Sequence, residues 1–491
     1  MIQGFDPRTG QAVGEPVAET TDAQVAAAVS AAAAASSAWA GTSPAVRAEI
    51  LTAVAAALDE RAAELAALAD SETALGSARL TGEVARATGQ LRMFADVLRD
   101  GAFLDVAETP AADGVPSLRR IDHPVGPVAV FAASNFPFAF SVPGGDTASA
   151  LAAGCPVIVK AHEAHPRTSA LTDEIMTAAL AAAGGPDGVF AVVHGVRAGV
   201  SLLRHPGVTA AGFTGSARGG FALQKICAER EVPIPFFGEL GSVNPVVVLP
   251  GAAAARPEAI ASGYAGSLTL GVGQFCTNPG LLFVPEDTAV LDAISAAVAG
   301  SRGGAMLSER IHDGFEAGVR ELAGDASVKP LATGRPGEGP WAGTPQVFHT
   351  GLAEFAAGLP GLAQERFGPA GLVISYPDVA ALAPVLARLG GNLAGSLHLD
   401  ESAPGDLDAA RAVLAVFGGT TGRIVFNGWP TGVAVSWAQH HGGPWPAATA
   451  PAYTSVGAAA IRRWLVPVVY QDCPLPLLPA GLRPHSHPRL P

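Results

Sequence analysis

The sequence predicts an α/β protein built from two doubly wound domains. From Val125 onward, short runs of β-branched and other apolar residues alternate with helical stretches, and Gly and Pro separate the runs. A second set of such runs begins near Pro245. Short apolar strands that alternate with helices are typical of a parallel sheet covered on both faces. Right-handed crossovers between the strands make such a sheet doubly wound.

The region before these strands is predicted to be mostly helical. Asp22 is the predicted cap of a helix that runs through an alanine-rich stretch to about Trp39. Apolar periodicity continues over residues 44–71 and 79–99, which predicts further helices. The segment 110–116 begins and ends with proline and interrupts this pattern.

The two sets of strands and helices can be placed by residue. In the first set, strands are predicted at 128–132, 157–160, 189–193, 210–213 and 233–237, with helices at 142–153, 167–183, 197–204 and 216–229. In the second set, strands are predicted at 246–249, 281–284, 372–376 and 423–427, with helices at 257–270 and 287–300. Residues 334–345 are predicted as a surface loop. The proline-rich tail from Pro467 is predicted to be an extended arm whose last ten or so residues lack fixed structure.

Composition excludes several classes of protein. The chain has 491 residues, of which 49% are hydrophobic and 15% charged, so it can bury sizeable cores. Its net charge of −13 argues against nucleic acid or an anionic membrane surface as a partner. We expect no signal peptide, because the start of the chain has neither a basic n-region nor a cleavage signature. We expect no membrane helix, because no strongly apolar run reaches eighteen residues. The four cysteines lack CxxC or zinc-finger spacing, which predicts a cytoplasmic protein without a metal.

Cys276 is the most informative residue of the chain. It lies in a Gly-rich loop, downstream of Glu239, which is predicted to lie in a Gly-flanked turn of its own. A thiolate readily forms covalent intermediates near neutral pH, and a carboxylate can serve as its base. Taken alone, Cys276 is better explained as filling a gap in the core, as most free cysteines do. The two residues therefore need support from the rest of the chain.

Other candidates follow the ends of predicted strands, where open α/β sheets bind ligands. The amide of Asn135 could donate to an oxyanion, although an Asx turn explains it equally well. Lys160 ends a strand and could reach a cofactor hydroxyl or phosphate, or simply be solvated. Thr214, Gly215 and Ser216 precede a helix with small residues in its first turn, where a pyrophosphate could bind. An ordinary serine N-cap is the alternative.

Together these motifs resemble the aldehyde dehydrogenase superfamily. The match covers nearly the whole chain in the family's order: Ser-Asn-Phe-Pro (134–137), the strand ending at Lys160, Phe-Thr-Gly-Ser (213–216), Glu-Leu-Gly-Ser (239–242), Gly-Gln-Phe-Cys (273–276), Glu-Arg-Phe-Gly-Pro (365–369) and Phe-Asn-Gly-Trp-Pro (426–430). The forms at 273–280 and 427–433 are most similar to the branch of 2-oxoglutarate semialdehyde (2,5-dioxopentanoate) dehydrogenases and some NADP-linked fatty aldehyde dehydrogenases. Ser242 stands where many relatives have glycine, and we expect it to narrow the cofactor crevice slightly.

The resemblance implies a role for each matching residue. Cys276 would be the nucleophile, Glu239 the general base, and the Asn135 amide with the Cys276 N–H the oxyanion hole. The implied activity is NAD(P)-dependent oxidation of an aldehyde to an acid through a Cys276 thioester, with 2,5-dioxopentanoate as the expected substrate and a fatty or medium-chain aldehyde as the alternative. The implied cofactor contacts come from Lys160, His162, Glu163, Thr214, Gly215, Ser216, Arg218, Gly241, Glu365 and Phe367.

The choice of cofactor depends on two opposing features. Glu163 matches a position where a carboxylate holds the adenosine ribose and would repel a 2′-phosphate, which favours NAD. Arg218, together with His162, could instead pair with that phosphate. One guanidinium can outweigh the carboxylate–phosphate repulsion, so we expect both cofactors to work with a modest preference for NADP.

The resemblance also implies an aldehyde dehydrogenase-like division of the chain. Residues 1–114 and 128–244 would form the dinucleotide-binding domain, and 245–452 the catalytic domain. Residues 115–127 and 453–491 would form a small β-arm for oligomerisation. The strands expected at Ser117–Asp122 and Trp464–Val469 look like exposed edges that need a partner. A homodimer or homotetramer is therefore expected.

Two other classes of function remain open at this point. An acylating relative would pass the thioester to coenzyme A or phosphate, but such relatives generally lack the glutamate that Glu239 matches. A catalytically inactive homologue would be a binding or structural protein.

Cys155, Cys227 and Cys473 are expected to serve only in packing. His440 and His441 are expected in a solvated loop, since no carboxylate or third histidine lies near them at metal-ligand spacing.

Overall fold

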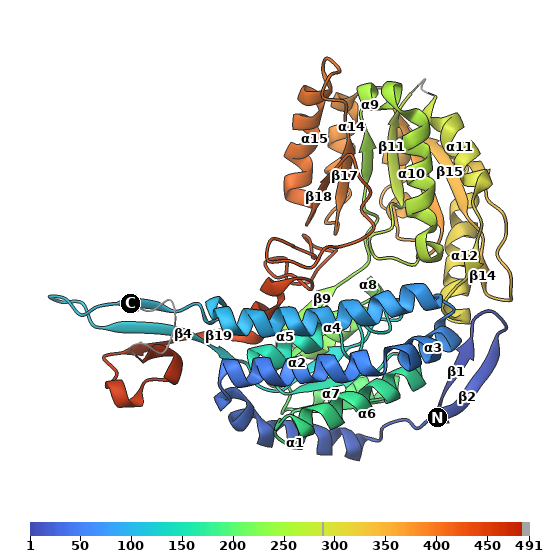
Figure 1. Cartoon of the computed structure of the whole chain (residues 1–491). Helices are drawn as coiled ribbons and strands as arrows, with labels where there is room; N and C mark the ends of the chain where they lie inside the picture. Colours follow the sequence, from blue (N-terminus) through green and yellow to red (C-terminus); the bar gives the residue numbers. More distant parts are fainter. Residues whose placement is uncertain (287–288, 484–491) are drawn as a thin grey trace.

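A computed structural model of the chain describes residues 1–286 and 289–483, arranged as two α/β lobes with a projecting β-arm (Figure 1). Each lobe is built on its own sheet, one of five strands and one of seven. The predicted α/β class is confirmed. None of the described helices is long and apolar enough to cross a bilayer.

The five-stranded sheet is parallel throughout, and its order is β7-β6-β5-β8-β9. The strand order reverses between β5 and β8, because the chain first adds β6 and β7 on one side of β5 and then β8 and β9 on the other. Ligands bind at the carboxyl ends of strands beside such a switch point. The strands are β5 (Val128–Phe131), β6 (Val157–Lys160), β7 (Phe190–Val193), β8 (Ala210–Thr214) and β9 (Phe236–Glu239).

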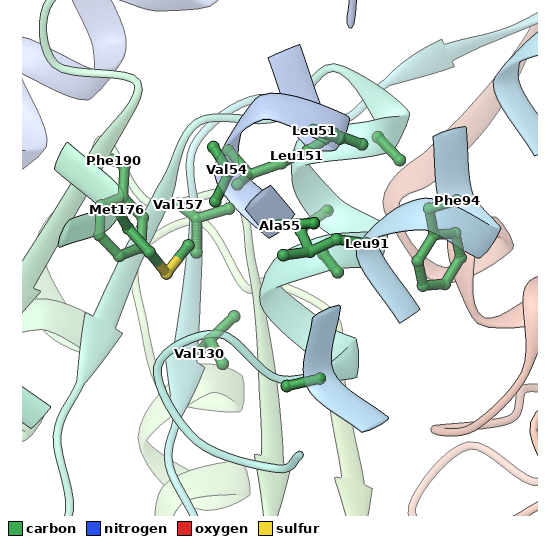
Figure 2. Close-up of a cluster of buried hydrophobic side chains, with 14 of the residues drawn as sticks. Leu51, Val54, Ala55, Leu91, Phe94, Val130, Leu151, Val157, Met176 and Phe190 are labelled. Carbon is green, nitrogen blue, oxygen red and sulfur yellow. The ribbon is translucent and has the colours of Figure 1, made fainter. Parts of the chain in front are cut away.

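Helices cover both faces of this sheet, and the alternation of side chains along β5 explains why. Val128 and Val130 belong to one buried core, whereas Ala129 and Phe131 belong to the core on the opposite face. Figure 2 shows the first core, where Leu51, Leu91 and Leu151 come from three different helices. The helices of this lobe are α1 (Asp22–Gly41), α2 (Pro44–Glu60), α3 (Ala62–Thr73), α4 (Ser77–Asp100), α5 (Gly145–Ala153), α6 (Pro166–Ala182), α7 (Val196–Arg204) and α8 (Ala217–Ala228).

The seven-stranded sheet has the order β13-β15-β16-β11-β10-β17-β18, and only β13 runs antiparallel to its neighbour. Its central strands are apolar on both faces, as expected for a sheet between two helical layers. The strands are β10 (Val246–Val248), β11 (Leu281–Pro285), β13 (Lys329–Thr333), β15 (Gln346–Gly351), β16 (Ala370–Tyr376), β17 (Gly395–His398) and β18 (Ile424–Phe426). The helices are α9 (Pro250–Ala255), α10 (Pro257–Thr269), α11 (Val290–Gly300), α12 (Glu309–Ala323), α13 (Leu352–Ala357), α14 (Val379–Leu386) and α15 (Asp406–Thr420).

Smaller elements connect these layers. A hairpin of β1 (Ile2–Asp6) and β2 (Gln11–Val17) starts the chain. Strands β12 (Gly304–Ala305) and β14 (Ala342–Gly343) pair with each other, so the loop predicted at 334–345 contains a short strand. The start of the helix predicted at 287–300 and residues 484–491 of the tail lie outside the described range.

The β-arm corrects the prediction of two exposed edges. Strand β4 (Leu118–Pro124) pairs with β19 (Leu465–Gln471) of the same chain on one side and with β3 (Ala107–Thr109) on the other. The segment Ser117–Asp122 is therefore central in its sheet, because the tail returns to it. The outer sides of β19 and β3 carry no further strand among the described residues.

Two local predictions also need correction. Thr21, not Asp22, is the N-cap of α1, because its side chain and that of Gln24 form a reciprocal capping box. Glu239 is not in a turn but is the last residue of β9, which starts at Phe236, later than predicted. The carboxylate is therefore fixed by a strand of the sheet.

The C-terminal region returns to the first lobe before it enters the arm. The 3₁₀ segment Ala458–Trp464 contributes Ile461 and Trp464 to the core against α4 and α5. Trp464 is completely buried, and its indole N–H donates to Ser149 Oγ at 2.8 Å. Part of the segment predicted for oligomerisation is thus a core element of this lobe. The domain boundaries themselves remain a prediction.

Candidate active site

A strained loop places Cys276 between the two lobes. After α10, Gly271, Val272 and Gly273 all adopt positive φ angles, of 54°, 58° and 67°. Such an angle is an outlier for a β-branched residue like Val272, and strain of this kind concentrates at functional sites. The following residues turn back toward the first sheet and bring the half-buried Cys276 to the junction.

Hydrogen bonds from Asn244, supported by Ser242, hold this loop in place. Asn244 Nδ2 donates to the carbonyls of Cys276 and Asn278 at 2.8 and 2.9 Å. The Ser242 hydroxyl lies 3.0 Å from Asn244 Oδ1 and accepts the N–H of Leu393 at 3.0 Å. This hydroxyl, which we expected to narrow the cofactor crevice, is instead used inside the loop network.

Glu239 reaches the same junction from the first lobe. It pairs with Thr214 in the sheet, and its carbonyl accepts the N–H of Gly215 at 3.1 Å. A backbone bridge to Ala448 attaches it to the long irregular segment that follows β18. The sheet register therefore sets the base beside the predicted pyrophosphate loop.

His441 is the largest correction at the site, because it is buried against Glu239 and not in a solvated loop. Its Nε2 lies 3.1 Å from Glu239 Oε1 and 3.6 Å from Cys276 Sγ. Ser455 donates a short hydrogen bond to Glu239 Oε2. The neighbouring His440 is only half-buried. Spacing along the sequence could not reveal this contact, since the carboxylate comes from the other lobe's sheet.

Burial, neighbouring charges and hydrogen bonds determine which of these groups are ionised. Burial raises the pKa of Cys276 well above its usual value, and the negative charges of Glu239 and Glu365 raise it further. Burial also opposes ionisation of Glu239, but the charge of His441 and hydrogen bonds from His441, Ser455 and Cys276 outweigh it and lower the pKa of Glu239. The resting site therefore contains a neutral thiol beside an ionised carboxylate, the arrangement in which the carboxylate can take the thiol proton.

Asn135 lies in the turn after β5, close to the nucleophile loop. Its Nδ2 donates to the carbonyl of Gln274 at 3.0 Å, two residues before Cys276. The turn is held by Glu83 of α4, whose Oε1 accepts the N–H groups of Phe138 and Ala139 at 2.8 and 3.1 Å. Burial raises the pKa of Glu83 to about 7, although these N–H groups and nearby arginines oppose the shift.

The residues predicted for the ribose of a cofactor meet at the end of β6. Lys160 forms a short ion pair with Glu163. Burial and the charge of Lys160 lower the pKa of His162 well below its usual value. His162 is therefore uncharged near neutral pH, and its contact with a 2′-phosphate stays a prediction.

The predicted pyrophosphate loop has the features that an anionic cofactor needs. Ser216 caps α8 by accepting the N–H of Gly219, so the positive end of the helix faces this loop. A Cβ added at Gly241 would clash with the carboxylate of Glu365, and one at Gly220 with Leu240. Arg218 is exposed in the first turn of α8, and Phe367 is half-buried. The backbone donors of this loop and the Lys160–Glu163 pair together fit a dinucleotide.

The same junction also has a donor set that could bind a metal ion. Within the described part of the chain, one ligand atom each of Glu239, Cys276 and His441 lies within 4.8 Å of the others. These atoms already contact one another as thiol, carboxylate and imidazole. The absence of a metal therefore stays a prediction.

Sequence comparison identifies the family. The profile described as the aldehyde dehydrogenase family matches residues 1–314, and the chain belongs to this family of oxidoreductases. The chain is 44% identical to alpha-ketoglutaric semialdehyde dehydrogenase 2 of Azospirillum brasilense, over 100% of this chain and 95% of that protein. It is 40% identical to the alpha-ketoglutaric semialdehyde dehydrogenase of Acinetobacter baylyi, over 98% and 93% of the two chains.

Solved structures agree on the fold. An aldehyde dehydrogenase C variant of Pseudomonas syringae, crystallised with NAD+ and octanal, matches with a TM-score of 0.78 at 22% identity, over 96% of this chain and 93% of that one. A structure from Burkholderia cenocepacia matches with a TM-score of 0.79 at 21% identity and covers 96% of both chains. Both support the aldehyde dehydrogenase-like arrangement of the two lobes.

The charge on Glu239 should affect the pH dependence of alkylation of Cys276. Because that charge raises the thiol's pKa, Glu239→Gln should shift the pH profile of iodoacetamide alkylation to lower pH. Mass spectrometry of the Cys276 peptide, in a Cys473→Ser background, measures the rate. Cys155 and Cys227 are buried, and burial raises their pKa values to about 12 and about 11, so both should react slowly.

Glu229→Gln is the matched control, since Glu229 is exposed on the far end of α8 and should leave the profile unchanged. An identical profile for Glu239→Gln and the parent enzyme would show that the carboxylate does not act on the thiol.

Proposed function

We propose that this aldehyde dehydrogenase oxidises 2,5-dioxopentanoate to 2-oxoglutarate. The observation that carries the proposal is the convergence of Cys276, Glu239 and the Asn135 amide at the junction of the lobes. The substrate is supported by the two full-length relatives whose names specify alpha-ketoglutaric semialdehyde. NAD(P) is the cofactor class of the family, and the residues around Ser216, Gly241 and Lys160 would hold it.

The first half of the proposed reaction begins with proton transfer from Cys276 to Glu239. The thiolate then adds to the aldehyde carbon, and a C–S bond forms as the carbonyl π-bond becomes an alkoxide. Asn135 Nδ2 and the Cys276 N–H would donate to that oxygen. Bound NAD(P) supplies the acceptor for the hydride that leaves this carbon, so that Cys276 is left as a thioester.

The second half is hydrolysis of the thioester. After Glu239 has released the first proton to solvent, it would take a proton from water as the water attacks the thioester carbon, and the Cys276 sulfur would leave as a thiolate. His441 and Ser455 would position the carboxylate from behind, since both contact it directly. A cavity of about 20 Å³ is lined by Glu239, His441 and Ser455 and is large enough for one water molecule.

Two substitutions test the roles of the nucleophile and the base. Cys276→Ala should abolish aldehyde oxidation while folding and cofactor binding persist, because the covalent intermediate cannot form. Glu239→Gln should retain a burst of reduced cofactor of about one equivalent per site, because the thiol ionises more readily without the neighbouring charge. It should slow the steady state by about 10²- to 10⁴-fold, because hydrolysis lacks its base. Stopped-flow absorbance of the reduced nicotinamide measures both phases. Appreciable turnover by Cys276→Ala, or an unchanged steady state in Glu239→Gln, would remove that residue from the mechanism.

We further propose a modest preference for NADP over NAD. Arg218 is the cation that supports it, since it is exposed and forms no ion pair among the described residues. Glu163 opposes it, but the ion pair with Lys160 offsets its charge.

Arg218→Ala should raise the KM for NADP about tenfold while the KM for NAD changes little, because only NADP carries the 2′-phosphate. Steady-state kinetics with each cofactor gives the comparison. Lys225→Ala is the control, since Lys225 lies on the same helix and pairs with Glu229. Equal effects of Arg218→Ala on both cofactors would assign the preference to NAD instead.

We also propose that the protein is a homodimer or homotetramer located in the cytoplasm. The outer side of β19 supports the assembly, because Val466, Val468 and Val469 are 46%, 39% and 54% exposed on a strand with an open edge. The four free cysteines support the compartment.

Light scattering at micromolar concentration should give a mass of at least two chains. Val468→Lys should shift the protein toward the monomer, since a charge would be buried at the strand edge. Val196→Lys is the control and should not change the mass, since Val196 is exposed at the start of α7. A monomeric parent protein would contradict the proposed assembly.

A further inference from the structure

Helix α4 presents two arginines to the turn that carries Asn135. Arg79 Cζ lies 5.1 Å from the ring centroids of both Phe136 and Phe275. Arg86, two turns further along, lies 5.8 Å from Phe136 and 5.5 Å from Phe140. Phe136 follows Asn135 and Phe275 precedes Cys276 in the chain. The two guanidinium groups thus flank the aromatic ring next to the proposed oxyanion donor.

Several donors of these guanidinium groups have no partner. Nε and Nη2 of Arg86 and Nη1 of Arg79 are buried and donate to no acceptor among the described residues. Arg79 uses one nitrogen, Nη2, to bind the carbonyl of Asn135 at 2.6 Å. Buried polar groups are nearly always hydrogen-bonded, so a cluster of unpaired cationic donors requires an explanation.

The nearest carboxylate does not supply the missing partner. Glu83 lies between the two arginines on α4, but its Oε1 is occupied by the backbone of Phe138 and Ala139. Neither arginine forms an ion pair within 4.0 Å in the described part of the chain. Burial lowers the pKa of Arg86, and the opposing charges of Glu83, Cys276 and Glu239 only partly offset it. The link to the nucleophile is geometric, because the Phe136 ring beneath Arg86 lies 5.4 Å from the ring of Phe275, which precedes Cys276.

Arg423 is the other arginine with a buried, unpaired nitrogen near the nucleophile. Its Nη1 and Nη2 already donate to the carbonyls of Gly432 and Pro430. It therefore lacks the free pair of donors that a planar anion would need. Arg86, with Nε and Nη2 both unpaired, retains such a pair.

We propose that Arg86, assisted by Arg79, binds the carboxylate of the substrate while its aldehyde end lies at Cys276. A guanidinium edge matches a carboxylate in geometry and charge, and stacking on the phenylalanines holds the edge in place. This arrangement would select short ω-oxo carboxylates over uncharged aldehydes. The inference rests on the proposed function and specifies how the same site recognises its substrate class.

The test compares two aldehydes of equal length, 2,5-dioxopentanoate and pentanal. The parent enzyme should show a higher kcat/KM for the carboxylate. Arg86→Gln should lower the ratio of the two kcat/KM values about 10- to 100-fold, the range expected for the loss of a charge-assisted contact, and mainly through KM for the charged substrate. Ki for 2-oxoglutarate as an inhibitor of pentanal oxidation should rise in parallel.

Arg92→Gln is the matched control, since Arg92 lies on the outer face of α4 in an exposed pair with Asp59 and should not alter the ratio. Arg86→Lys keeps the charge without the planar edge and should recover part of the ratio. An Arg86→Gln enzyme that keeps the ratio, including one that loses activity equally on both substrates, overturns the assignment of Arg86. A raised KM for the cofactor with an unchanged ratio overturns it as well.

The two proposals can fail separately. A parent enzyme that does not discriminate between the two aldehydes contradicts the proposed substrate. A parent enzyme that discriminates, combined with an unchanged ratio in Arg86→Gln, leaves the substrate standing and removes only the arginine.

Discussion

The hydrogen bonds from Asn244 to the carbonyls of Cys276 and Asn278 fix the position on which the rest of the site depends. They attach a strained loop of the second lobe to the short connection that leaves β9 of the first. Glu239 ends β9, so a few residues of chain bring base and nucleophile to one point. Because each lobe is packed around its own sheet, this small network sets the geometry between them.

The electrostatics of the site follow from that close approach. A buried carboxylate beside a buried thiol favours the protonated thiol, and a histidine and a serine behind the carboxylate favour its ionised form. The proton is thus held by the group that must lose it, next to the group that can accept it. His441 belongs to a segment from far along the chain, so the pairing requires that this segment return to the first lobe.

Helix α4 has one side in the hydrophobic core and another side that faces the candidate active site. Its apolar side, including Leu91 and Phe94, is buried in the core, whereas Arg79, Glu83 and Arg86 face the turn of Asn135. Glu83 fixes the backbone of that turn, and the arginines retain unpaired donors beside it. A single helix thereby supports the proposed oxyanion donor and contributes the cations proposed to bind substrate.

The sequence by itself determined the α/β class, most strand and helix positions, and the motifs around Cys276, Glu239 and Asn135, because periodicity and local motifs involve residues that are close in the chain. Only the tertiary structure decided that His441 contacts Glu239, that β4 pairs with β19, and that Arg86 packs over Phe136 beside the turn of Asn135. Each of these contacts joins segments far apart in the sequence. The packing of the two sheets determines which segments meet, so the contacting residues have no fixed separation in the sequence that could be recognised.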